Sequence, residues 1–319
     1  MRRDEAHRHL GPILEDADPP ARAPSRLHLA ECRSFSSTSS FGVLVTEAAR
    51  KVDVEPRALA VRVLLHLPRV ASYDGWVTRR EVQREISISA ERLHGNALAA
   101  RNHVPRGTFL LGDLSFEEID SSVAVPILKS LHYLRSARPG SLYFALVDPA
   151  DKLPVSLCSV TPLQWKCVGN QIRAQFAIPP ERVWDISRLY SVDGAPTNAI
   201  SSLLSKVRLC FRHRMPRAEL LVTAVDPNLG FTGSSYRAAN WQQWLTVKAR
   251  PYLYENGCYV SPRQLRERYG TGSLVELQAK YPGRFQQSKL RLLDSLIYCC
   301  SVNGETRVVL DQDRRRLHR

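Results

Sequence analysis

One stretch of the chain, VDPNLGFTGSSYRAANWQQW at 225–244, holds two groups that could act together in acyl transfer. The apolar run before it predicts a buried strand that ends at Asp226, and a glycine-bearing loop then leads into a short predicted helix with Tyr236. Acyl transfer to an amine needs a base for the N–H proton and an acid for the departing sulfur. Asp226 could accept or orient the amine proton, and Tyr236 could donate one. The alternative for Tyr236 is a core tyrosine with a satisfied hydroxyl.

Arg188 is a charged residue inside a predicted strand, ERVWDISRLYSVD. It alternates with Trp184, Ile186 and Tyr190, so we expect it to share a strand face with large apolar side chains. A guanidinium in such a place must bond a carboxylate, a phosphate or a carbonyl. Asp226 could be that partner, and a buried pair that serves only architecture is the alternative.

A predicted helix start at 196–202 could bind an anion. The motif PTN ends the preceding loop, and Ser201 and Ser202 fall in the first turn, where hydroxyl and free N–H groups can reach a phosphate. No acidic residue occupies this turn, which keeps it receptive to negative charge. Ordinary helix capping without a ligand is the alternative.

His132 and Tyr133 form a further polar pair, at the end of the amphipathic helix predicted for AVPILKSLHYL. A histidine followed by a tyrosine at a helix end can line a pocket. The same two residues can equally lie on the solvent face of the helix.

The elements that must position these groups belong to a chain of 319 residues, which suffices for one large or two medium domains. No apolar run approaches the roughly 20 residues of a membrane span. The start, MRRDEAHRHL, lacks the apolar segment of a secretory signal. The seven scattered cysteines show no zinc-binding spacing, so we expect reduced thiols and a cytoplasmic protein.

The charge balance favours a polyanionic partner. Lys and Arg number 45 against 31 acidic residues, which gives a net charge of +14. Such a surplus favours nucleic acid through counterion release. A genome rich in G and C that encodes many arginines is the alternative explanation.

The first third of the chain predicts a tail and a helical module. Residues 1–40 are rich in Pro, Arg, Ser and Asp and predict a disordered tail. Apolar spacings of three and four residues predict helices over 41–115. Within them, Thr78 can cap one short helix and Ser87 to Ser89 can lead into a second, a pairing typical of a helix-turn-helix or winged-helix module. A plain helical bundle is the alternative.

The rest of the chain predicts a mixed sheet. The order of strands and helices from 120 to 310 indicates an α/β (α+β) domain with helices on the faces of the sheet. Strands are predicted for SLYFALVD, LPVSLCSV, ERVWDISRLYSVD and AELLVTAV, and a helix for NAISSLLSKVRLCFR. Asn303-Gly304 predicts a hairpin between LIYCCSV and ETRVVL. Residues 311–319 predict a mobile basic tail.

Six ordered motifs together resemble the phage Mom-type DNA-modification proteins, which have a GNAT acyltransferase-like fold. The resemblance covers about 120–310 and depends on the combination, since each motif alone is unspecific. The motifs are HY at 132–133, DISRL at 185–189, DGAPTN at 193–198, the Ser201-Ser202 helix start, VDPNLGFTGSSYRAAN at 225–240 and RYGTGSL at 268–274.

The resemblance implies a modification of adenine N6 in duplex DNA that depends on acetyl-CoA or another acyl-CoA. It would give a methylcarbamoyl-type group that masks restriction sites, in a bacterial or phage-infected cytoplasm. The catalytic residues that it implies are Asp226, Tyr236, Arg188, Tyr133 and His132. The residues that it implies for cofactor binding are Thr197, Asn198, Ser201, Ser202 and Asn240.

Two departures from the patterns of related enzymes are visible. The usual GNAT pyrophosphate loop, Q/R-x-x-G-x-G/A, is absent, and DGAPTN stands in its place, as the resemblance leads us to expect. Mom-type proteins often carry G-H before G-T-I-Y, whereas Gly230 here precedes FTGSSY, so that histidine has no counterpart. A metal cofactor finds no support in the sequence, and nothing in it indicates an oligomeric state.

Three functions are therefore open. The first is an acyl-CoA-dependent enzyme that modifies DNA bases. The second is a GNAT-like N-acyltransferase that acts on a small molecule, an aminoacyl group or tRNA. The third is a DNA-binding protein without catalytic activity. The positive charge and the N-terminal module favour the first and third. The first and second are favoured by the presence of Tyr133, Arg188, Ser201, Asp226 and Tyr236.

Overall fold

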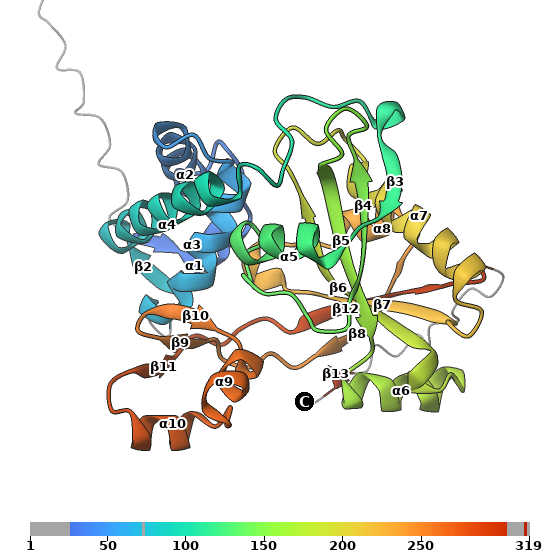
Figure 1. The fold of residues 1–319 in the computed structure, drawn as a ribbon. Helices are drawn as coiled ribbons and strands as arrows, with labels where there is room; N and C mark the ends of the chain where they lie inside the picture. Colours follow the sequence, from blue (N-terminus) through green and yellow to red (C-terminus); the bar gives the residue numbers. More distant parts are fainter. Residues whose placement is uncertain (1–25, 72–73, 305–315, 318–319) are drawn as a thin grey trace, which may run out of the picture.

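The computed structural model describes residues 26–71, 74–304 and 316–317. Its largest element is an eight-stranded mixed sheet in the order β13-β8-β12-β7-β6-β5-β4-β3 (Figure 1). The strands are β3 (Ser115–Glu118), β4 (Leu142–Val147), β5 (Pro154–Pro162), β6 (Val183–Ser191), β7 (Leu220–Val225), β8 (Gln242–Val247), β12 (Ser295–Ser301) and β13 (Arg316–Leu317). Neighbours are antiparallel except for β6 with β7 and β13 with β8. The predicted α/β class with a mixed sheet is confirmed.

Helices cover both faces of this sheet because successive strand residues point to opposite sides. In β7, Leu221 and Val225 pack with α7 (Ala199–Arg214) on one face. Leu220 and Val222 pack with α6 (Lys166–Phe176) on the other face. The face covered by α6 also carries α5 (Ser121–Ser130), which packs on Tyr143 and Leu157. The strands and the helix predicted for 183–225 are thus confirmed.

The N-terminal helices form a second layer of structure beside the sheet. They are α1 (Leu29–Arg33), α2 (Ser40–Lys51), α3 (Pro56–Val70) and α4 (Arg79–Ala100), with a small β1-β2 pair (Arg26–His28 and Trp76–Thr78). Their core continues into the C-terminal part of the chain through Tyr252, Tyr254, Leu290 and Leu292. The Tyr254 hydroxyl donates to the carbonyl of Leu65 at 2.7 Å, which fixes this contact.

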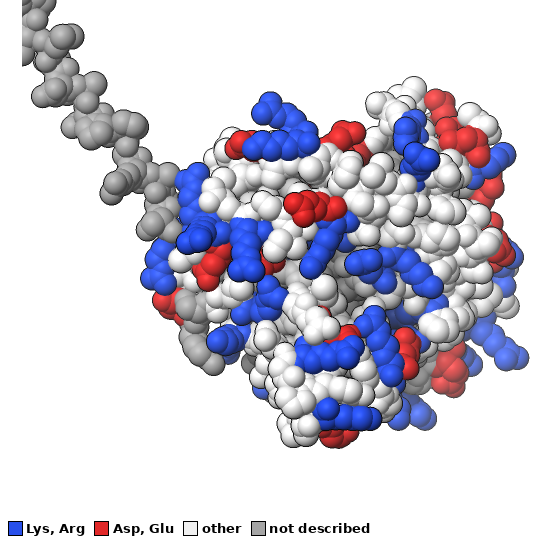
Figure 2. Space-filling model, turned by 60° about the vertical axis from the view of Figure 1, so that its left-hand side comes forward, with Lys and Arg blue, Asp and Glu red and all other residues white. Residues whose placement is uncertain are grey.

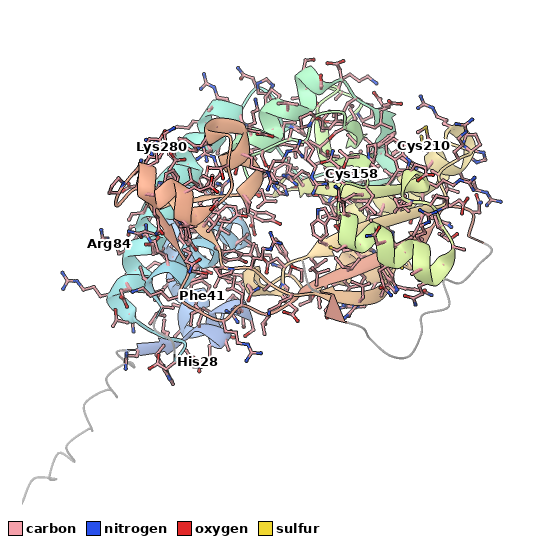
Figure 3. All side chains as sticks on the ribbon, turned by 90° about the horizontal axis from the view of Figure 1, so that it is seen from below. His28, Phe41, Arg84, Cys158, Cys210 and Lys280 are labelled. Atoms are coloured by element: carbon pink, nitrogen blue, oxygen red, sulfur yellow. The ribbon has the colours of Figure 1, made fainter. Side chains whose placement is uncertain are left out.

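The C-terminal part contains a three-stranded sheet in the order β10-β9-β11 (Figure 1). Its elements are β9 (Leu253–Glu255), β10 (Cys258–Val260), α9 (Pro262–Tyr269), α10 (Leu274–Lys280) and β11 (Phe285–Gln287). Figure 3 views the molecule from below, and open space separates the part that carries Lys280 from the part that carries Cys158.

The predicted helix-turn-helix is wrong. Residues 79–100 form one continuous helix, α4, which begins with a capping box between Thr78 and Glu81. The serines predicted to break it do not, because Ser87 Oγ donates back to the carbonyl of Gln83 at 3.1 Å and so satisfies its hydroxyl within the helix. The alternative of a plain helical bundle fits the observed packing of α2, α3 and α4.

The predicted N-terminal tail is too long. Residues 26–33 form β1 and α1, whose Leu27, Leu29 and Cys32 are buried in the helical core. Burial of these apolar side chains offsets the entropy of ordering the segment. Residues 1–25 lie outside the described residues.

Two predictions concern the end of the chain. The first strand of the predicted hairpin is β12, which pairs with β7 on one edge and β8 on the other, whereas the second, 305–310, lies outside the described residues. In the predicted basic tail, residues 316–317 form β13 and pair with β8. The remainder of that tail lies outside the described residues.

Candidate active site

The candidate site lies where two parallel strands separate. Strands β6 and β7 pair only from Val183 to Asp185, opposite Leu220 to Val222, although both continue further. Beyond this ladder, Thr223 Oγ1 hydrogen-bonds the carbonyl of Ile186 at 2.9 Å and closes the gap at its narrow end. Strand separation exposes backbone polar groups, which need a ligand or other partners.

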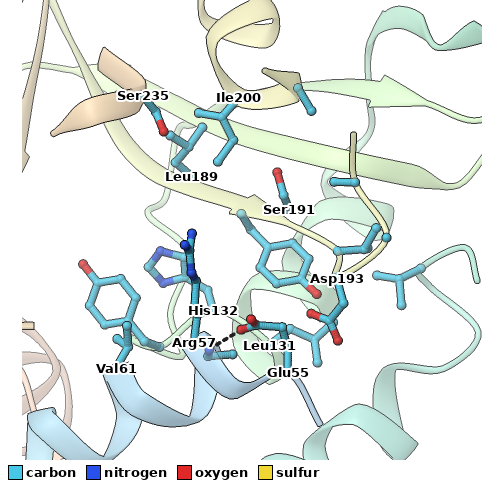
Figure 4. A pocket seen from close by; sticks show the side chains of 18 of the residues that line it. Glu55, Arg57, Val61, Leu131, His132, Leu189, Ser191, Asp193, Ile200 and Ser235 are labelled. Atoms are coloured by element: carbon cyan, nitrogen blue, oxygen red, sulfur yellow. Dashed lines mark hydrogen bonds between the residues drawn. The ribbon is translucent and has the colours of Figure 1, made fainter. Parts of the chain in front are cut away.

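The start of α7 faces a large cavity, which we name the α7 cleft (Figure 4). Its volume is about 850 Å³. Its walls come from the end of β6, the start of α7, the loop around Arg106, helices α3 and α4, and α8 (Ser234–Ala238). The walls of this cavity therefore come both from the part of the chain that forms the sheet and from helices of the N-terminal layer.

The first turn of α7 offers free N–H groups to this cleft. The N–H of Ala199 donates to Pro196 at 3.1 Å and that of Ser202 to Asn198 at 2.9 Å. Within the described part of the chain, this leaves the N–H groups of Ile200 and Ser201 without a backbone partner. No acid lies in the turn, and Asn198, with a left-handed φ of 67°, bends the chain into it. Such a turn can hold a phosphate.

Close packing holds the loop before α7 in place. Gly194 lies against the backbone of Gly107, so closely that a Cβ at this position would come within 1.8 Å of the Gly107 carbonyl oxygen. The N–H of Phe109 donates to the Gly194 carbonyl at 3.3 Å. The DGAPTN segment is thus fixed by residues that lie outside the motif.

Charges of both signs line the α7 cleft. Arg57 and Arg106 could meet phosphate oxygens, whereas Glu55 and Asp193 oppose them (Figure 4). Burial and the nearby carboxylates of Glu55 and Asp53 raise the pKa of Asp193 to about 6. Asp193 therefore becomes fully charged only above neutral pH.

The five residues predicted to bind a cofactor divide into two groups. Asn198 and Ser201 line the α7 cleft. Ser201 Oγ donates to the Asn198 carbonyl at 3.0 Å, which orients the hydroxyl in the first turn. The other three, Thr197, Ser202 and Asn240, do not belong to its lining.

A smaller cavity of about 240 Å³, which we name the Asp226 cavity, opens toward β9 and β10. It contains Asp226 and Arg188, and aromatic rings form much of its wall. These aromatic lining residues are Tyr133, Trp165, Tyr252 and Tyr259. The cavity is therefore suited to a flat, polar ring.

The Asp226 carboxylate is held by three hydrogen bonds. Oδ1 accepts the backbone N–H of Asn228 at 2.9 Å and its side-chain Nδ2 at 2.8 Å. Oδ2 accepts the hydroxyl of Tyr252. A carboxylate oxygen has about two acceptor directions, so Oδ2 keeps one for a ligand. Sequence reasoning missed Tyr252, because no local motif links a tyrosine 26 residues away to Asp226.

Arg188 does not pair with Asp226, so that prediction is wrong. Its guanidinium donates to the Ser136 carbonyl at 2.8 Å, to Ser136 Oγ at 2.8 Å and to the Ser187 carbonyl at 2.5 Å. The nearby carboxylate, Asp185, pairs with Arg138 instead. The predicted alternation also fails, because the pairing of β6 with β5 shifts register at Ser187 and interrupts the regular faces.

His132 and Tyr133 follow α5 rather than ending it, because the helix stops at Ser130. Arg62 of α3 donates to the carbonyls of Ser130 at 3.2 Å and Leu131 at 2.7 Å, which satisfies the end of α5 and fixes the turn. His132 is buried, so the predicted alternative of a solvent-facing pair does not hold for it. Sequence reasoning missed this role of Arg62, because no local motif links it to the end of α5.

The electrostatics of this pair follow from burial. Burial, reinforced by Arg188 and Arg62, lowers the pKa of His132 well below its usual value, so the ring is neutral. Nδ1 accepts the Leu134 N–H at 3.2 Å, so the ring proton is assigned to Nε2. Burial and the Asp226 carboxylate raise the pKa of Tyr133, which keeps its phenol protonated.

Tyr133 is the one described residue that lines both cavities. Its ring lies 5.4 Å from that of Phe231 in the α7 cleft, while Asp226 and Arg188 influence it from the other side. The two cavities thus share Tyr133, whose phenol is protonated, in their walls.

Tyr236 does not share a cavity lining with Asp226 and Arg188. Its hydroxyl hydrogen-bonds Thr223 Oγ1 at 3.2 Å, where β6 and β7 separate, and its ring stacks on Tyr298 with centroids 5.7 Å apart. Burial raises its pKa, so this phenol also stays protonated. The structure therefore brings together Asp226, Arg188 and Tyr133, and places Tyr236 beside them behind Thr223.

Among the described residues, no group of three or more His, Cys, Asp or Glu side chains could hold a metal ion. None of the described helices combines the length and apolar character of a membrane-crossing segment.

Several solved structures share a low similarity with this chain. Arabidopsis thaliana NAA60 in complex with acetyl-CoA has 13% identity and a TM-score of 0.35, over 60% of this chain and 99% of that one. A spermidine N-acetyltransferase from Vibrio cholerae in complex with CoA and spermine has 8% identity and a TM-score of 0.32, over 60% and 98%. Ribosomal-protein-S5-alanine acetyltransferase from Vibrio fischeri has 9% identity and a TM-score of 0.33, over 66% and 100%. At these scores the likeness carries no argument about function.

A comparison with protein families gives a firmer result. No curated protein matches the chain. The Mom protein family, in contrast, matches residues 113–310, which include both cavities' sheet residues and all ten candidate site residues. The helices α1 to α4, of which α3 and α4 line the α7 cleft, lie before the matched region.

Proposed function

Because the chain belongs to the Mom protein family, we propose that it transfers a group derived from an acyl-CoA to N6 of adenine in duplex DNA. Transfer of the acyl group breaks the C–S bond and forms a C–N bond, so its direct products would be an N6-acyl adenine and free CoA. Conversion to the methylcarbamoyl-type group that protects DNA from restriction would need a nitrogen donor. The observation that carries the proposal is the meeting of the α7 cleft and the Asp226 cavity at Tyr133. One cavity suits a nucleotide thioester and the other suits a base.

The α7 cleft fits an acyl-CoA in volume and in chemistry. The free N–H groups of Ile200 and Ser201 would hold phosphate oxygens, with the Ser201 hydroxyl beside them. Arg57 and Arg106 would add positive charge. When bound, the acyl-CoA supplies an activated thioester. Tyr133 and the side chains near it would orient the amine, stabilise charge and protonate the departing sulfur.

Asp226 would bind and orient the adenine amine. Its free acceptor direction on Oδ2 can take an N–H of the exocyclic amine, and the hydrogen bonds from Asn228 and Tyr252 keep the carboxylate from turning away. Arg188, fixed by Ser136, would stabilise negative charge that develops nearby.

Tyr133 would protonate the departing sulfur. Its phenol lies between the cavities and stays protonated because its pKa is raised. Tyr236, the donor expected from the sequence, lies behind Thr223 and outside both linings. We therefore propose that Tyr133 donates the proton to the sulfur and that Tyr236 has a packing role.

The acceptor base would have to leave the duplex. The Asp226 cavity lies between the large sheet and the β9-β10 part, where a base within a helix cannot enter. Its tyrosine and tryptophan rings would stack on an extruded base and offset part of the cost of unstacking.

The proposal is tested by nucleoside mass spectrometry. Genomic DNA from bacteria that express the wild type should contain a mass-shifted deoxyadenosine, and DNA from cells with Asp226→Asn should contain about a hundredth as much. Asparagine keeps the size of the side chain, so matched thermal melting would show that the variant folds. An unmodified adenine pool in cells with folded wild type contradicts the proposal. Acyl-CoA consumption by small amines alone would support the small-molecule acyltransferase instead.

A further inference from the structure

Cations surround the opening of the Asp226 cavity. Several of the segments that line the cavity carry an exposed or half-buried Lys or Arg at the lining residue or next to it. We name the set the cationic rim, and it consists of Arg135 beside Leu134, Lys166 beside Trp165, Lys248 beside Ala249, Arg250 itself, Arg263 beside Pro262 and Arg291 beside Leu292. These positions come from five separate segments, so their convergence is a property of the fold rather than of one basic run.

Most of the cationic rim has its charge available. Arg135, Lys166, Lys248, Arg250 and Arg291 are exposed, and in the described part of the chain no ion pair joins any of them to a carboxylate. Arg263 differs, because it pairs with Glu267 at 2.9 Å and donates to Gln164 at 3.1 Å. It links α9 to the segment before α6 and so holds two sides of the rim together.

The acids nearest to the opening are fewer than the rim cations and offset only part of this charge. Asp226 is bonded to Asn228 and Tyr252, and Asp185 is paired with Arg138, both inside the cavity. Asp294, next to the lining residue Ser295, accepts the backbone N–H of Ala249 at 3.1 Å. Figure 2 shows Lys and Arg side chains on several sides of a hollow in this face of the molecule.

From this arrangement we infer that the cationic rim binds the phosphate backbone of duplex DNA on either side of the nucleotide that enters the Asp226 cavity. This inference rests on the proposed function. A small anion could occupy one or two of these exposed cations and would gain little from each. A polyanion can meet several at once and release its condensed counterions.

The contrast with the α7 cleft supports this placement. The acids Asp53, Glu55 and Asp193 in that cleft balance its Arg57, Arg62 and Arg106, so its lining carries no excess of positive charge for a duplex. The cationic rim carries an excess of exposed positive charge, so electrostatic steering directs a polyanion to the Asp226 cavity. Phosphate contacts of this kind position the duplex and carry no sequence information.

The test compares two double variants with the same loss of charge. Arg250→Gln with Arg291→Gln removes two rim charges. Lys206→Gln with Arg217→Gln removes two exposed charges on α7 and the turn after it, away from both cavities. Binding of a fluorescent DNA duplex is followed by anisotropy over a range of salt concentrations, and acyl-CoA binding is measured by calorimetry on all three proteins.

We expect the rim variant to bind duplex about tenfold more weakly, with a salt slope smaller by about 2, because two phosphate contacts are lost. The α7 variant should stay within about twofold of the wild type, and acyl-CoA affinity should not change in either. Equal losses of duplex affinity in both variants would contradict the role of the cationic rim, but they would not contradict DNA as the substrate. A wild type that binds acyl-CoA but no duplex would overturn the proposed function as well. Tighter binding of an RNA duplex than of DNA would also contradict the inference.

Discussion

The α7 cleft and the Asp226 cavity differ in size and in the groups that they present to a ligand. The α7 cleft is wide, carries charges of both signs and offers mainly backbone N–H groups at the start of one helix. The Asp226 cavity is smaller, has aromatic walls and depends on side chains from separate segments. Backbone groups suit phosphates, which every CoA carries, whereas placed side chains suit one acceptor. In the proposed function, this difference would separate a general cofactor site from a selective acceptor site.

The largest expected effect on turnover comes from changing Tyr133, the residue that lines both cavities. Tyr133→Phe removes the phenol that lines both, and we expect turnover to fall about 100-fold, as for loss of a general acid. Tyr236→Phe is the matched control, and its turnover should fall less than about fivefold, because its hydroxyl contacts Thr223 outside both linings. Both are measured as product formed in single turnover. A larger loss of turnover in Tyr236→Phe than in Tyr133→Phe would show that Tyr236 is the general acid.

A charge placed in the α7 cleft should affect the cofactor alone. Ser201→Glu puts a carboxylate where phosphate oxygens would lie, and we expect acyl-CoA affinity to fall about 30-fold, or ~2 kcal/mol. Ser202→Glu puts the same charge in the same turn but outside the lining, and it should cost less than about fivefold. Calorimetry measures both, and duplex binding should stay unchanged. Equal effects of the two variants would show that phosphates do not contact Ser201.

The smallest expected effect concerns pH. The pKa of Asp193 is raised to about 6, so this residue is mainly neutral at pH 5 and charged at pH 7. As pH rises through this range, a negative charge forms in the α7 cleft and repels phosphates, which should weaken acyl-CoA binding about threefold. Asp193→Asn should lack this component. Phosphate groups of the ligand titrate in both proteins, so the ratio of the two affinities isolates Asp193. A constant ratio from pH 5 to 7 would contradict this role.

The start of α7 could be predicted from the sequence because local signals determine it. The motif DGAPTN, the absence of acids and the amphipathic pattern of NAISSLLSKVRLCFR lie next to one another in the chain, and the helix begins where they predict. The strand that leads to Asp226 was equally visible, since β7 is a short apolar run.

The partners of the candidate side chains could not be predicted in the same way. Arg188 was expected to meet Asp226, but a register shift in β6 and a loop 52 residues away decide its contacts. Tyr252 and Arg62 belong to segments with no motif, and only tertiary packing brings them to the site. Contacts between distant segments depend on how the elements pack, which periodicity alone does not describe.

The N-terminal helices show the same limit at the level of whole elements. Serines at 87 and 89 suggested a break, yet α4 continues through them because helical neighbours and packing outweigh weak local preferences. The structure therefore gives these helices a different role from the predicted one. Rather than a helix-turn-helix, α3 supplies Glu55, Arg57 and Arg62 to the walls and support of the α7 cleft.

A crystal structure with bound CoA would test the proposed cofactor site most directly. We expect electron density for the phosphates at the N–H groups of Ile200 and Ser201, with the thiol end of the ligand directed toward Tyr133. CoA density in the Asp226 cavity, or at another surface with the start of α7 left to solvent, would contradict it.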